Sequence, residues 1–380
     1  MFSRIIRIAA VLLGVILLAG GCVRRFDPDP APEGESISFR AGSTLLRDDA
    51  TKGATPKEAD GDVREFLVYG TKTVSGNRSS VFGGVSVTHN SNIWTYSPVR
   101  YWDANASRYE FLGVSGPESV NSSTTSPTIS ATLTYNPTSA QYDLMAACDY
   151  RERYAGVLDM NSPVVMVFEH LLSAVSVVVY NDSPMQHISL VSYGFRNLYI
   201  RQNVRVSYYW PSPTSEWLDD ATKAKDTSNP LLTWVANDVE NVEDREAGRE
   251  LHPGKHAPLY TQADADELDE ELNKLEGLNW DMMIPQTLNP LSSAPLLMVK
   301  YRLVDYSNDP VPVRTVSEPI ETPIRLNTIQ NSGGEDILEW EKGKKYIYEI
   351  HIRYGGGISV TVTTSDWDEV RAGTPGLIIS

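Results

Sequence analysis

The run Tyr346-Ile347-Tyr348-Glu349-Ile350-His351-Ile352-Arg353-Tyr354, the turn Gly355-Gly356-Gly357 and the run Ile358-Ser359-Val360-Thr361-Val362-Thr363 decide the fold class. Large apolar residues occupy every second position on both sides of the glycines, which is the period of a β-strand with one buried face. Three consecutive glycines allow the chain to reverse direction. This stretch therefore predicts a β-hairpin.

Short alternating segments of the same kind recur along most of the chain, separated by Gly, Pro, Asn and Ser. Many short strands with few helices favour an all-β fold built of β-sandwiches. The predicted strands are Phe66–Tyr69, Val85–His89, Tyr109–Val114, Thr128–Tyr135, Val175–Tyr180, Ile188–Val191, Val204–Tyr209 and Leu296–Val304.

One helix is predicted between Thr261 and Gly277. Leu268, Leu272 and Leu275 fall on one helical face, Thr261 and Asp264 have the spacing of a capping box, and Gly277 is a stop signal. The expected helix would pack this apolar stripe on a sheet and expose its acidic residues.

The N-terminus has the order of a signal peptide over residues 1–21. Arg4 and Arg7 precede an apolar run that is too short to span a bilayer, and Ala19-Gly20-Gly21 leads into Cys22. A cysteine directly after small residues predicts lipoprotein processing, with Cys22 carrying acyl chains such as palmitate. Residues 22–35 are rich in proline and polar residues, which predicts a lipidated tether.

Composition limits the partners of the processed chain. Residues 1–21 carry two positive charges and the whole chain has a net charge of −16, so the mature charge is −16 − 2 = −18. Such a surface repels nucleic acid and anionic lipid, which argues against partners of either kind. Cys148 is the only cysteine besides Cys22, so the mature chain has no internal disulfide available and must fold by burial alone.

The processed length is enough for two domains. We expect an N-terminal β-sandwich over residues 36–185 and a C-terminal one over residues 186–380. The segment Pro211–Gly254 is rich in Asp, Asn, Pro and Ser and weakly periodic. It is either a linker or a set of long loops on the second sandwich.

The residues indicate neither an enzyme nor a cofactor or metal site. His252 and His256 are separated by Pro253-Gly254, which excludes a shared helical face. Ser115 lacks the glycine spacing of a nucleophile elbow. Asp264, Asp266 and Asp269 lack the glycine of a calcium loop, and His170 lies among apolar residues, where a core role is expected.

Tryptophans offer an alternative reading. Aromatic side chains can stack on sugars, although aromatics in strands more often pack in the core. The residues concerned are Trp94, Trp102, Trp210, Trp217 and Trp234. They leave open a non-polymerising, glycan-binding surface lipoprotein.

Several blocks of the chain resemble the fimbrillin-like proteins of Bacteroidetes, the lipoprotein subunits of type V pili. They occur in the family's order over nearly the whole mature chain. The blocks are Val81–Val87, Trp94–Asp103, Phe168–Val175, Ile284–Leu288 and Trp340–Trp367.

The resemblance implies two transthyretin-like β-sandwich domains in a pilus subunit located in fimbriae at the cell outer membrane. It also implies that an arginine-specific protease removes the first strand and that a strand of another pilin subunit replaces it. A host or bacterial surface ligand would be a further partner.

Candidate residues for this assembly can be placed on the chain. Ser36-Ile37-Ser38-Phe39 is the expected first strand, with Ile37 and Phe39 on one face. Arg47 and Arg40 are the candidate cleavage sites, since Lys52 would resist an arginine-specific enzyme. Leu377-Ile378-Ile379, within the 13 residues after Trp367, is the candidate donor strand.

Overall fold

The structure is a computed structural model, and strands account for nearly all of the regular structure in the part of the chain that it describes. Two short 3-10 helices are present, η1 (Leu326–Thr328) and η2 (Tyr354–Gly356). In the described ranges no helix is long and apolar enough to cross a membrane. The described residues are 34–43, 63–90, 93–115, 121–123, 129–137, 142–225, 231–235, 249–254, 256–258, 280–289, 293–307, 313–331 and 333–367.

The first sheet has seven strands in the order β1-β9-β8-β5-β2-β3-β4. The β1–β9 pair is parallel, and the other neighbours are antiparallel. The strands are β1 (Phe39–Ser43), β9 (Val164–His170), β8 (Met145–Glu152), β5 (Arg108–Ser115), β2 (Glu65–Val74), β3 (Asn77–Asn90) and β4 (Ile93–Tyr96).

A smaller sheet packs on one face of the first. Its order is β13-β12-β7-β6, and a short further strand pairs with β12. Apolar side chains of β5, β7 and β12 form the shared core, among them Leu112, Leu133 and Val204. The strands are β13 (Thr214–Leu218), β12 (Tyr199–Ser207), β7 (Ser130–Tyr135), β6 (Asn121–Ser123) and β14 (Ala224–Lys225).

Two further sheets enclose a second large core. One has the order β17-β10-β25-β26-β23, with β18 also on β10; the other has the order β15-β11-β20-β21, with β16 and β22 attached. Their strands are β17 (His256–Pro258), β10 (Ser173–Asn181), β25 (Lys344–Ile352), β26 (Ile358–Asp366), β23 (Gln330–Asn331), β18 (Asp281–Met283), β15 (Leu231–Val235), β11 (His187–Arg196), β20 (Leu296–Ser307), β21 (Val313–Val316), β16 (Arg249–Leu251) and β22 (Ile320–Arg325). A small ladder joins β19 (Gln286–Thr287) to β24 (Glu339–Trp340).

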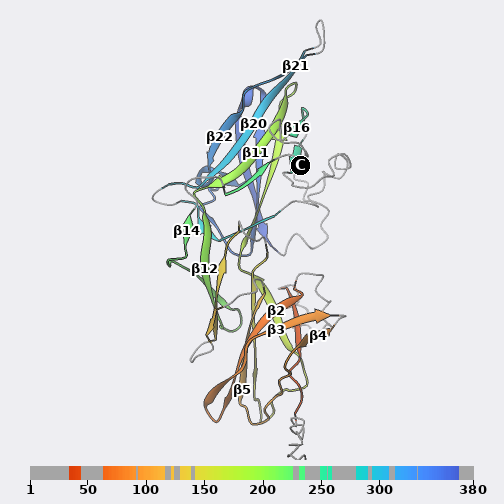
Figure 1. The fold of residues 1–380 in the computed structure, drawn as a ribbon, viewed down its shortest axis with the longest axis vertical. Coiled ribbons are helices and arrows are strands. Elements are labelled where there is room, and N and C mark those ends of the chain that lie inside the picture. Colours follow the sequence, from red (N-terminus) through yellow and green to blue (C-terminus); the bar gives the residue numbers. More distant parts are fainter. Residues whose placement is uncertain are drawn as a thin grey trace, which may run out of the picture.

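The molecule is elongated (Figure 1), with the first sheet at one end and β20, β21 and β22 at the other. Buried apolar residues form three clusters: one inside the first sheet, one between it and the smaller sheet, and one between the last two sheets. The all-β, sandwich-type prediction is confirmed.

The predicted hairpin is confirmed as β25 and β26, which pair from Lys344↔Asp366 to Ile352↔Ile358. All eight other predicted strands overlap observed ones, namely β2, β3, β5, β7, β10, β11, β12 and β20. Within the described part of Pro211–Gly254 there are four short strands: β13 and β14 pair with β12, and β15 and β16 pair with β11. The predicted helix 261–277 lies outside the described residues.

Strand pairing links residues on both sides of the predicted domain boundary. β10, which precedes residue 185, pairs with β25, whereas β12, which follows it, pairs with β7. The chain therefore passes from the first half into the second, returns with β12 and β13, and leaves again. The division into 36–185 and 186–380 stays a prediction.

Candidate functional site

The first strand, β1, lies at one end of the strand order of the seven-stranded sheet, and its apolar side chains face the core that the sheet encloses. β1 pairs in parallel with β9, from Phe39↔Val164 to Ser43↔Phe168. Just before β1, the amide of Ile37 donates to the carbonyl of Arg100, and the amide of Trp102 donates to Glu35, both at 2.9 Å. Residues 100–102 follow β4, the last strand of the sheet. The two ends of the sheet therefore meet at the first strand: residues 35–37 pair with residues 100–102 on one side, and residues 38–43 pair with β9 on the other.

Side chains of the first strand alternate as the sequence predicts. Ile37, Phe39 and Ala41 are buried, Ser38 is exposed and Arg40 is half-buried. The Tyr96 hydroxyl donates to the carbonyl of Ile37 at 2.6 Å. Burial raises the pKa of this hydroxyl, so it keeps its proton and its donor role at neutral pH.

Phe39 is the centre of an aromatic cluster inside the curled sheet. Its ring meets four others edge to face, with centroid distances of 5.5 to 6.0 Å. Each such contact adds about 0.5–1.5 kcal/mol to the effect of area burial. The four rings come from β2, β3, β4 and β5: Phe66, Phe82, Tyr96 and Phe111. Removal of the first strand would therefore open a groove floored by aromatic rings and bordered by unpaired backbone of β9 and residues 100–102.

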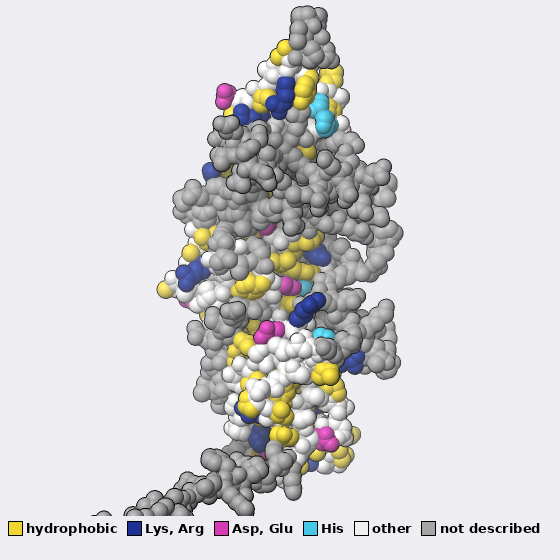
Figure 2. All heavy atoms as spheres, turned by 45° about the vertical axis from the view of Figure 1, so that its right-hand side comes forward, with side chains coloured by type: hydrophobic (Ala, Val, Ile, Leu, Met, Phe, Trp, Pro, Cys, Tyr) yellow, Lys and Arg dark blue, Asp and Glu magenta, His cyan; other side chains and the backbone are white. Residues whose placement is uncertain are grey.

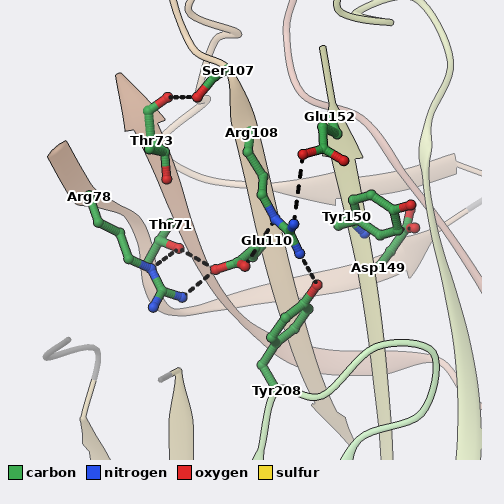
Figure 3. Close-up of polar contacts among 10 residues, drawn as sticks. All are labelled: Thr71, Thr73, Arg78, Ser107, Arg108, Glu110, Asp149, Tyr150, Glu152 and Tyr208. Carbon is green, nitrogen blue, oxygen red and sulfur yellow. Dashed lines mark hydrogen bonds and ion pairs between the residues drawn. The ribbon is translucent and has the colours of Figure 1, made fainter. Parts of the chain in front are cut away.

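A polar network on the outer surface of the same sheet holds the groove-forming strands together (Figure 3). Arg78 of β3 pairs with Glu110 of β5, and Arg108 lies 3.1 Å from the same carboxylate. The Arg108 guanidinium also donates to the Tyr208 hydroxyl at 3.3 Å and lies 3.9 Å from Glu152. Single surface ion pairs contribute little, but this network joins three strands of the first sheet, β3, β5 and β8, to the residue that follows β12, and it is independent of β1.

Asp149 fills a gap where β8 and β9 separate. These strands pair only at Met145↔His170 and Ala146↔Glu169. Farther along, the Asp149 carboxylate accepts the amide of Val165 at 3.0 Å and pairs with Arg151 at 3.0 Å. Burial raises the pKa of Asp149, against the lowering effect of Arg151 and the amide donors.

Of the site residues predicted from the sequence, Arg40 alone lies in the described part of the chain. Arg40 lies within the paired strand β1. Cys22, Arg47 and Leu377, Ile378 and Ile379 lie outside the described residues, as do Lys52 and the acidic residues of the predicted helix. The proposed cleavage, lipidation and donor roles stay predictions.

Other residues considered for chemistry have structural surroundings. His170 is buried, its Nδ1 lies 2.7 Å from Asp143, and its ring stacks on Trp367 at 4.3 Å, which confirms the predicted core position. Ser115 donates to the carbonyl of Glu65 at 3.0 Å. The His252 ring contacts His187 at 4.6 Å.

The tryptophans differ in burial. Trp102 belongs to the core, Trp94 and Trp217 are half-buried, and Trp210 is exposed. The side chain of Trp234 lies outside the described part. On the face drawn in Figure 2, the described acidic and basic side chains are interspersed with uncharged ones.

The partners of the first strand could not be found from the sequence. Glu35 pairs with Trp102, and Phe39 with Val164, so the contacts span roughly 65 and 125 positions of the chain. One signal for an extended partner segment was present in the Trp94–Asp103 block, where large side chains alternate on either side of Ser97-Pro98.

Comparison with known proteins supports the resemblance drawn from the sequence. Residues 54–195 match the model of the fimbrillin-like family, and this match confirms the resemblance. A search of curated proteins gives no match.

Solved structures align with most of the chain at low sequence identity. A fimbrial protein from Bacteroides vulgatus aligns with a TM-score of 0.51 and 14% identity, over 88% of this chain and 100% of that chain. A proposed cell adhesion protein from Bacteroides uniformis aligns with a TM-score of 0.42 and 14% identity, over 87% and 99%. One from Parabacteroides distasonis aligns with a TM-score of 0.43 and 10% identity, over 88% and 99%. At such identity the first likeness speaks for the fold alone.

Proposed function

We propose that this chain is a lipid-anchored, surface-exposed fimbrillin-like subunit that assembles by strand exchange. In this proposal Cys22 anchors the uncut precursor in the outer membrane, and an arginine-specific protease then cuts after Arg47 or Arg40. A cut after Arg47 releases all of β1 together with the lipidated Cys22, whereas a cut after Arg40 falls within β1 and leaves Ala41–Ser43 on the subunit. A strand from another subunit, with Leu377-Ile378-Ile379 as its apolar part, then fills the groove in a fimbria.

The observation that carries the proposal is the pairing of the first strand with both ends of the sheet, residues 35–37 with residues 100–102 and residues 39–43 with β9, over an aromatic core. A segment that supplies alternate buried side chains and pairs on both sides can be replaced by another extended segment with the same alternation. The empty groove would expose several hundred Å² of apolar surface, worth roughly 10 kcal/mol at about 25 cal/mol per Å². That free energy favours capture of a new strand over a stable open form.

Purified precursor tests the mechanism directly. Cleavage with an arginine-specific protease is expected to give ladders on a denaturant-resistant gel and filaments by electron microscopy. Arg47→Gln and Arg40→Gln, made separately, identify the arginine that is cut. Deletion of Gly376–Ser380 is expected to stop assembly and leave the cut monomer folded.

Two outcomes contradict strand exchange. A cut full-length chain that remains a soluble monomer would do so, and so would a truncated chain that still forms ladders. The uncut precursor is the matched control and is expected to stay monomeric.

A second candidate function, glycan binding without polymerisation, is favoured by the loop after β12. Tyr209 and Trp210 are 64% and 42% exposed, yet the loop is fixed. Cys148 donates its thiol to the carbonyl of Tyr209 at 3.3 Å, and the Trp210 ring packs on Tyr150 at 4.8 Å. A rigid aromatic pair beside the charges of Arg108 is suited to stacking against a sugar ring.

Binding to a surface coated with gastric mucin glycans tests this second function. Trp210→Ala is expected to reduce binding, whereas Tyr354→Ala, which removes a 63% exposed ring at the other end, is the matched control. Equal retention by both variants would remove the support that this loop gives.

A further inference from the structure

The turn between β8 and β9 has an unusual composition for its geometry. Tyr154 and Val157 exchange two backbone hydrogen bonds of 2.9 Å, and the two residues between them, Ala155 and Gly156, have φ angles of 50° and 82°. Two-residue turns with positive φ at both positions strongly favour Asn-Gly or Asp-Gly. Alanine at the first position costs conformational free energy because its Cβ is crowded there.

All four residues of this turn, which we call the YAGV tip, are apolar and point away from the core. Tyr154 is 86% exposed, the highest value among the large apolar side chains of the described residues, and Val157 is 70% exposed. With alanine in place of the usual polar turn residue, the Tyr154 hydroxyl is the one polar side-chain group left at the tip. The composition is unfavourable in water and is explained if the tip is covered by an apolar medium.

The YAGV tip is held rigidly. The Arg153 guanidinium donates to the carbonyl of Gly156 at 2.7 Å and to that of Ala106 at 3.0 Å. The Arg153 amide donates to the carbonyl of Ser107 at 2.8 Å. These hydrogen bonds join the tip to the loop before β5. The entropy cost of ordering the tip on contact with a surface is therefore small.

The folded chain begins beside this unit. Glu35 accepts the amide of Trp102, and the loop held by Arg153 follows directly at residues 103–107. Only 11 residues, 23–33, separate Cys22 from Gly34 at the start of the described chain. Fully extended they span at most about 40 Å. An anchor at Cys22 therefore keeps this end of the molecule, the end opposite β21 in Figure 1, close to the bilayer.

We propose that the YAGV tip contacts the lipid surface to which Cys22 is anchored, with Tyr154 at headgroup level and Val157 against the acyl boundary. The inference rests on the proposed lipid anchor. Tyrosine suits this depth because its ring is apolar and its hydroxyl can stay hydrated. The tether length favours a membrane over a second copy as the occupant, because it brings the bilayer to this end of every anchored chain.

The test uses the lipidated full chain in phosphatidylcholine vesicles. An environment-sensitive fluorophore is placed at Ala155→Cys or, as matched control, at Met185→Cys, and Cys148→Ala leaves no other free thiol. Met185 is 75% exposed in the turn before β11, at the opposite end. Emission at position 155 is expected to shift to the blue and to be quenched several-fold more strongly by spin-labelled lipid than emission at position 185.

Adding Tyr154→Ser and Val157→Ser is expected to reduce the quenching at position 155 about tenfold while the chain still floats with the vesicles. Water-like emission at 155 in a floating chain would overturn the inference and leave the anchor standing. A chain that does not float would overturn both. A blue shift that vanishes when fewer chains are loaded per vesicle would show contact between copies and overturn the lipid contact.

Discussion

Phe39 combines two roles at the residue scale, because it fills the core of the curled sheet and belongs to the strand that is proposed to leave. Ser38 and Arg40, its neighbours, are exposed and half-buried. The alternation separates side chains that stabilise the fold from side chains that face outward. The two kinds of residue give a matched pair for mutation.

Phe39→Ala is expected to lower the free energy of unfolding of the precursor by about 3–5 kcal/mol, the usual cost of truncating a buried ring. Ser38→Ala, one position away, is expected to change it by about 0.5 kcal/mol or less. Urea denaturation of both variants measures the difference. Equal stabilities would mean that the first strand is not part of the cooperative fold.

Asp149 makes stability depend on pH in a direction opposite to most carboxylates. Because burial raises its pKa above the unfolded value, the folded state binds this proton more tightly, and the contribution is largest below the unfolded pKa and lost as pH rises through the folded pKa. Wild type is therefore expected to exceed Asp149→Asn in stability by more at pH 4 than at pH 7. Urea titrations at both pH values test this.

Asp103 provides the opposite control. A hydrogen bond from Lys72 and the amide of Asn105 hold its pKa below the usual range. Its contribution is present above the unfolded pKa and lost as pH falls through the folded pKa, so the advantage of wild type over Asp103→Asn should be largely kept from pH 7 to pH 4 and should shrink at about pH 3. The same trend in both variants would contradict the assignment for Asp149.

At the scale of elements, alternation predicted many of the strands, although it missed β9, whose burial alternates from Val164 to His170. β25 and β26 were predicted correctly because their apolar residues alternate with polar ones. β8 was missed because both of its faces are covered: Met145 and Ala147 belong to the core inside the curled sheet, whereas Ala146 belongs to the core under the smaller sheet. A strand buried on both faces has no alternation to read.

The first strand was predicted at residues 36–39, whereas β1 runs from Phe39 to Ser43, and its neighbours were not predicted. Ile37 and Phe39 have the period of a strand, which is a local property. Pairing with β9 and with residues 100–102 depends on how distant segments meet, and a single sequence carries no local record of that. The return of β12 to pair with β7 was missed for the same reason.

A peptide of residues 35–43 is expected to bind the cut chain from which the first strand has been removed and to suppress its assembly. A peptide with Ile37→Asp and Phe39→Asp keeps the backbone donors but not the buried side chains, and its affinity should be at least about tenfold lower. Fluorescence anisotropy of labelled peptides measures both. Equal affinities of the two peptides would show that the groove does not recognise the side chains of Ile37 and Phe39.

At the scale of the whole molecule, three clusters follow one another along the long axis, and the chain crosses between halves several times. Trp367 packs in the middle cluster, where its amide donates to Gly343 at 2.9 Å. The last 13 residues therefore start near the waist of the molecule. The N-terminal tether starts beside the YAGV tip, so the two proposed attachment segments leave from different levels.

Cys22→Ser is expected to abolish incorporation of a palmitate analogue, because the thiol is the group that receives lipid. Metabolic labelling followed by membrane fractionation measures it, and the mutant chain should leave the membrane fraction. Cys148→Ser is the control, since Cys148 is buried, and should label as wild type does. Undiminished label in the Cys22 variant would refute the anchor.

The parallel pairing of β1 with β9 gives any assembly a sense of direction. A replacement strand that keeps this register must point the same way as β1, entering at the end that bears the YAGV tip and running toward the waist. Every subunit would then receive from one side and donate toward the other. Such a polymer has unlike ends: one carries an unfilled groove and the other an unused tail. A subunit with a permanently occupied groove or a missing tail would therefore act as a terminator, and the proportion of such subunits would set the length of the fibre.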